Sequence, residues 1–127
     1  MGMNLYVAAK DLTGNLKVPE EFWEGLSAGE YVEKDDGDVY VPNPKHNPIF
    51  HVEMNQGNAM HIIEHVLELK IDGGMFDASL DDMIAKIALM SLEGKFEYGS
   101  YTQLKLKEIL DLCLWGKANG CNQIYGA

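Results

Sequence analysis

The hydrophobic residues of this chain change their period near its middle, and that change limits the folds open to it. Phe50, Val52 and Met54 alternate with polar residues, a period of two that is typical of a strand with one buried face. Beyond residue 59, apolar residues instead recur every three or four positions, as on one face of a helix. The length of 127 residues suits one hydrophobic core. We therefore predict a single α+β domain over residues 1–127.

The first half of the chain predicts most of an antiparallel sheet. Residues 5–9 are expected to form its first strand, and a short helix is expected to begin at Pro19, since proline suits the first helical position. Residues 31–32 and 39–41 flank an Asp-Gly turn signal and predict a hairpin. Three prolines within residues 42–48 predict a loop before the strand that contains Val52.

The second half of the chain predicts about three helices that pack against this sheet. They are expected over residues 59–70, 79–93 and 102–119, and residues 123–125 are a candidate for a closing strand. The last helix is apolar nearly all round, which favours deep burial or an interface between copies of the chain. A homo-oligomer is therefore one possibility. We interpret Met1-Gly2 as a cloning remnant ahead of a native Met3.

The charge of the chain limits the kinds of partner that it can bind. There are 20 acidic residues and ten basic ones, for a net charge of −10, and every basic residue is a lysine. Arginine, the usual bidentate ligand of phosphate, is absent from the sequence. Nucleic acid and anionic membranes would repel such a chain, so we expect neither to bind it directly. A basic protein is the partner that this charge favours.

Cysteine usage and hydropathy indicate a cytoplasmic protein. No apolar run approaches the roughly 20 residues of a membrane span, and the first residues lack the pattern of an export signal. Cys113 and Cys121 have no second pair that would suggest a disulfide framework or a zinc knuckle. We expect both to be reduced thiols packed inside the fold.

Acidic residues gather in one tract, residues 18–38, and Trp23, Tyr31 and Tyr40 lie in or just beyond it. The tract holds eight acids against Lys34 alone, which accounts for −7 of the net charge of −10. Such a row of carboxylates can imitate phosphates or steer a basic protein into contact, and aromatic anchors in a charged rim are typical of tight interfaces. The expected partner-binding residues are Glu20, Glu21, Trp23, Glu24, Glu30, Tyr31, Glu33, Asp35, Asp36, Asp38 and Tyr40.

The leading functional hypothesis is a small acidic protein without enzymatic activity that binds another protein. It would act as an antagonist, in the manner of immunity proteins and phage-encoded inhibitors, by covering the basic active or nucleic-acid-binding surface of its partner. The alternative interpretation of the tract is a solvated acidic face that keeps the chain in solution. That alternative stays open at the level of sequence.

A second, enzymatic hypothesis comes from residues 61–65, which read His-Ile-Ile-Glu-His. The H-x-x-E-H spacing places two imidazoles one helical turn apart beside a carboxylate, so His61 and His65 could hold zinc while Glu64 activates its water. These five residues resemble the zinc helix of the inverzincin peptidases and of the S-ribosylhomocysteine lyase family, which implies a zinc-dependent hydrolase or lyase. A further ligand would be needed, and the candidates are His51, His46, Cys113, Cys121 and Glu93. The competing interpretation is the solvated face of an ordinary amphipathic helix.

Overall fold

The computed structural model describes residues 2–34, 37, 39–94 and 99–127 and confirms the α+β class. Its main sheet is antiparallel, with strand order β2-β1-β7-β6, and β5 pairs with the first residues of β1. The strands of this sheet are β1 (Gly2–Lys10), β2 (Leu16–Lys17), β5 (Glu53–Asn55), β6 (Phe76–Ser79) and β7 (Gln123–Gly126). The closing strand at the end of the sequence is thus present, and it lies between β1 and β6.

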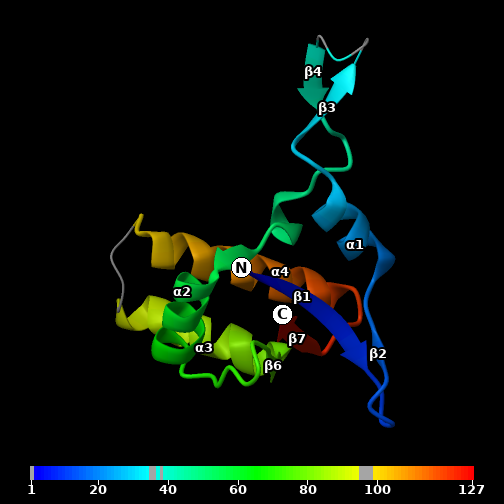
Figure 1. Ribbon diagram of the computed structural model, residues 1–127. Helices are drawn as coiled ribbons and strands as arrows, with labels where there is room; N and C mark the ends of the chain where they lie inside the picture. Colours follow the sequence, from blue (N-terminus) through cyan, green and yellow to red (C-terminus); the bar gives the residue numbers. More distant parts are fainter. Residues whose placement is uncertain (1, 35–36, 38, 95–98) are drawn as a thin grey trace.

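Helices cover the main sheet (Figure 1), and they are α1 (Glu20–Ser27), α2 (Gln56–Ala59), α3 (Leu80–Glu93) and α4 (Tyr101–Ala118). A side chain caps the first turn of α3, where Ser79 Oγ accepts a hydrogen bond from the amide of Asp82 at 3.0 Å. The helix α3 ends at Gly94, whose φ of 63° suits a left-handed C-terminal residue. The helices α3 and α4 pack together, and α4 also packs on β1.

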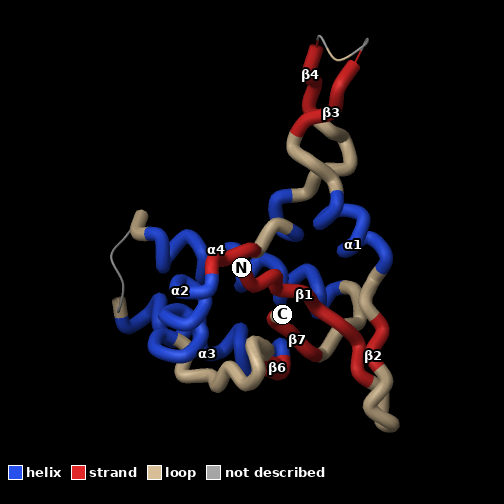
Figure 2. The backbone as a smooth tube through the Cα atoms, viewed as in Figure 1, coloured by secondary structure: helices blue, strands red, loops and turns tan. Residues whose placement is uncertain are grey.

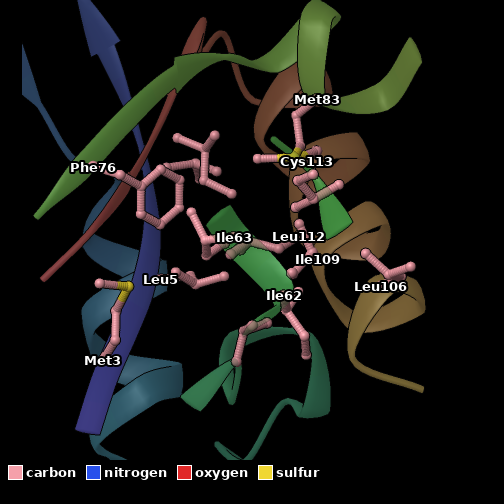
Figure 3. Packing of buried hydrophobic residues seen from close by; sticks show 14 of the residues in the cluster. Met3, Leu5, Ile62, Ile63, Phe76, Met83, Leu106, Ile109, Leu112 and Cys113 are labelled. Carbon is pink, nitrogen blue, oxygen red and sulfur yellow. The ribbon is translucent and has the colours of Figure 1, made fainter. Parts of the chain in front are cut away.

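The core lies between the sheet and the helices, and Figure 3 shows its layers. Leu5 on β1 and Phe76 on β6 face Ile109 and Leu112 on α4. Ile63 fills the space between them, and its side chain is fully buried. This arrangement confirms that strands of the first half and helices of the second half share one core. No helix among the described residues is long and apolar enough to cross a membrane.

Two predicted elements differ in detail. The strand expected from Phe50 begins only at Glu53, because residues 48–50 form a 3-10 turn, η1 (Pro48–Phe50), with Asn47 Oδ1 accepting from the amide of Ile49. The helix expected over 59–70 begins earlier, with α2, and continues as a π-helix, η2 (Met60–Val66). The alternation of Phe50, Val52 and Met54 nonetheless marks three buried side chains.

The predicted hairpin does not join the main sheet. The strands β3 (Tyr31–Lys34) and β4 (Val39–Pro42) pair only with each other as a separate two-stranded sheet. Figures 1 and 2 show this hairpin standing away from the rest of the chain, beyond α1. Among the described residues, the hydrophobic core takes none between Leu26 and Ile49. We call residues 30–43 the arm.

Candidate functional site

The arm presents two faces of different chemistry. Residues directly opposite each other in an antiparallel pair share a face, and neighbours along a strand alternate. Glu33 pairs with Tyr40, and the Tyr40 hydroxyl donates a hydrogen bond to Glu33 Oε1 at 3.1 Å, so this face is aromatic and acidic. The opposite face is aliphatic, because Val32 pairs with Val41 and Lys34 pairs with Val39.

Neither face of the arm is covered by the domain. Tyr31 is 57% exposed and Tyr40 is 62% exposed, which is unusual for large aromatic side chains held in a strand. Val32 and Val39 are exposed as well. An isolated two-stranded hairpin is marginally stable in water, since it buries little of its own surface. The arm therefore carries apolar and aromatic contact area that its own fold leaves unused.

The helix α1 adds acidic residues beside the base of the arm. Phe22 is fully buried and Gly25 is buried, so the turn that carries Glu20 and Glu24 faces solvent. Trp23 is 46% exposed, and its ring contacts Tyr6, with 5.6 Å between ring centroids. Trp23 thus serves the packing of α1 on the sheet and also leaves nearly half of its surface accessible.

The glutamates of the tract carry no neutralising partner within the described residues. The ion pairs between described residues join Lys105 with Glu108, Lys107 with Asp111 and Lys117 with Asp81, all away from the tract. The exposed members of the tract are Glu20, Glu21, Glu24, Glu30 and Glu33. Asp35, Asp36 and Asp38 of the predicted site lie outside the described residues. The structure places the five glutamates on two consecutive elements, α1 and the arm.

The two ends of the arm are tied together at its base. The amide of Asn43 donates to the carbonyl of Glu30 at 3.0 Å, which extends the hairpin pairing by one step. His46 Nδ1 lies 3.4 Å from the carbonyl oxygen of Ala28, and its ring packs on His51 with 4.4 Å between centroids. These contacts link the segment that precedes the arm with the segment that follows it, and they restrict how the arm is oriented at its base.

The H-x-x-E-H residues are arranged differently from an α-helical zinc motif. They lie on η2, whose hydrogen bonds span five residues, so each turn holds more residues than an α-turn. Glu64 follows His61 by three residues, and three residues cover a smaller part of a π-turn than of an α-turn. Glu64 therefore lies further from His61 around the helix axis than it would on an α-helix. Glu64 is half-buried and lines one hollow, whereas His65 is exposed and lines another. The rings of His61 and His65 have 6.2 Å between centroids.

Of the candidate further ligands, Glu93 lines the same hollow as His65, and the others lie elsewhere. His51 packs against His46 at the base of the arm. Cys113 and Cys121 are buried and unpaired, as expected, and burial raises the pKa of the Cys113 thiol to about 12. Within the part of the chain that the structure describes, no three histidine, cysteine, aspartate or glutamate side chains lie close enough to hold a metal ion.

The sequence patterns did not indicate that the hairpin stands apart from the core or that a helix widens at residues 60–66. A signal for the first existed, because Glu33 and Lys34 place a charge on each face of the strand at 31–34, whereas a buried strand has a continuous apolar face. The helix expected over 102–119 is buried at Leu106, Ile109 and Leu112 but exposes Leu104 and Leu114. Homo-oligomerisation stays a prediction.

Comparison of the chain with protein-family models, with curated proteins and with solved structures found no match. The fold and the site define an α+β domain with a projecting acidic arm.

Proposed function

We propose that this chain is a non-enzymatic binding protein whose arm and α1 engage a basic surface of another protein. It would act as an antagonist, covering an active or nucleic-acid-binding surface of that partner. The observation that carries the proposal is the arm itself, which stands outside the core with Tyr31 and Tyr40 exposed beside glutamates that form no ion pair with a described residue.

Electrostatics support a basic partner. Five exposed glutamates on α1 and the arm lack an ion pair with any described lysine, so their field is not neutralised locally. Complementary charge raises association rates and rejects wrong partners, while buried aromatic anchors supply much of the affinity. The arm combines both features, because Glu33 and Tyr40 lie side by side on one face. A second copy of this chain is disfavoured as occupant, since it would bring the same negative charge.

The test compares two variants of equal charge. The tagged protein is used to capture basic proteins from a cell lysate, and each captured protein is then purified and its binding measured by calorimetry at low and high salt. We expect E30Q/E33Q to weaken binding at least tenfold at low salt. The matched control E53Q/E68Q removes two exposed carboxylates outside the tract, and we expect it to bind like the wild type.

Two results would overturn the proposal. One is equal binding by wild type and E30Q/E33Q at both salt concentrations, which would leave the tract as a solvated face only. The other is equal weakening by the two variants, which would reduce the effect to net charge. Tyr40→Ala provides a further measurement, because loss of an anchoring ring should weaken binding without changing its salt dependence.

A further inference from the structure

A hollow of about 490 Å³ opens beside η2, where β1 begins, and none of its lining residues belongs to the arm. Its apolar lining includes Met3, Ala59, Met60 and Ile71. Small-molecule sites are typically hollows of about 300–1,000 Å³ with apolar walls and a few polar groups. The volume and lining of this hollow therefore match those of a ligand site.

Met60 shows that the apolar wall faces water. It lies on the first turn of η2 and is 45% exposed, although its neighbours along the helix, Ile62 and Ile63, are fully buried. Methionine is flexible and adapts its shape to different occupants. An exposed apolar side chain at the wall of a hollow gives an aliphatic ligand surface to cover.

Besides the terminal carboxylate of Ala127, which also lines this hollow, Glu64 supplies its charge. It is the one charged side chain among the described lining residues, and Gln56 adds a polar amide. Glu64 is half-buried, and its side-chain carboxylate makes no hydrogen bond or ion pair with another described residue. A partly desolvated carboxylate without a partner favours a cation beside it.

The π-helix directs Glu64 to this place. Its wider turn shifts Glu64 around the helix axis relative to His61, and the next residue, His65, lines a different hollow together with Lys86. π-helical turns are rare and often occur at functional sites. We propose that this hollow binds a small molecule with a primary ammonium group and an aliphatic body, with Glu64 facing the ammonium and Met60 covering the aliphatic part.

The experiment uses three probes that share a five-carbon chain, namely pentylammonium, 1-pentanol and hexanoate. Each is titrated into the ¹⁵N-labelled protein, and the amide shifts of Met60, Gly73 and Gly74, which line the hollow, are followed. We expect saturable shifts at these residues, with pentylammonium about tenfold tighter than pentanol, because a hydrogen bond to a charged group is worth more than a neutral one. Hexanoate should bind most weakly.

Two matched variants separate Glu64 from the general negative charge of the chain. Glu64→Gln should reduce the preference for pentylammonium over pentanol at least fivefold and leave pentanol binding unchanged. Glu68 is exposed, follows Glu64 by four residues and lines the hollow that contains His65. Glu68→Gln should therefore keep the preference for pentylammonium over pentanol. The proposal is overturned if no probe gives saturable shifts at these residues, if hexanoate binds as well as pentylammonium, or if the two variants behave alike.

Discussion

The Cα of Gly25 lies directly against the ring of Phe50, and a Cβ atom at residue 25 would overlap that ring. Gly25 belongs to α1, which precedes the arm, and Phe50 belongs to η1, which follows it. The ring of Phe50 also packs edge-on against Phe22 and Trp115, with centroid separations of 5.6 Å and 4.7 Å. This single contact therefore joins both ends of the arm to the core.

Gly25→Ala is expected to destabilise the protein. The added methyl group must displace the buried ring of Phe50, and overpacking of this kind typically costs about 1–3 kcal/mol. Urea unfolding measures the loss in the free energy of unfolding. Gly57→Ala is the control, because a Cβ there would meet only ordinary contacts on α2, and alanine favours a helix. A stable G25A protein would show that α1 does not pack on Phe50.

Removal of the arm is expected to leave the domain folded. Glu30 and Asn43 are already hydrogen-bonded across its base, so an Asn-Gly turn can replace residues 31–42. The core takes no described residue from the arm, and we expect the free energy of unfolding to change by less than about 1 kcal/mol. Circular dichroism and urea unfolding check this. Partner binding should be lost in the same protein, and a large destabilisation would contradict the separation of arm and core.

Stability is expected to fall in alkali because of Cys113. Burial raises the pKa of this thiol from its usual value near 9 to about 12, so the folded chain favours the protonated thiol. The resulting stabilisation is fully present below about pH 9 and is lost as the pH rises toward 12. At pH 10.5 the free energy of unfolding should be lower than at pH 8 by about 2 kcal/mol from this group. Cys113→Ala should show a correspondingly smaller pH dependence, and an unchanged one would contradict the assignment.

Zinc is expected to bind no more tightly to the wild type than to His61→Ala. Two imidazoles on η2 meet no third ligand among the described residues, and Glu64 is turned into a different hollow from His65. Equilibrium dialysis against zinc, followed by elemental analysis of both proteins, measures the difference. One zinc per wild-type chain that disappears in the variant would restore the enzymatic hypothesis and require a search for its further ligand.

The order of the elements was readable from local patterns. The period of two around Val52 and Met54 identified buried side chains, and the Asp-Gly signal identified the hairpin, because both depend on neighbours in the chain. The strand at Phe76–Ser79 was not predicted, since it follows a Gly-Gly turn and is only four residues long. It pairs with β7, whose residues lie nearly fifty positions later in the sequence, so no local pattern indicates the pairing.

Composition and sequence by themselves determined the α+β class, the buried thiols and the acidity of residues 18–38. These properties follow from residue types and their spacing, which folding does not change. Only the tertiary structure decided that the hairpin projects, that Glu64 and His65 face different hollows, and that β7 lies inside the sheet. The physical reason is that each of these features depends on contacts between residues that are far apart in the sequence. Those contacts decide which surfaces are buried in the one core.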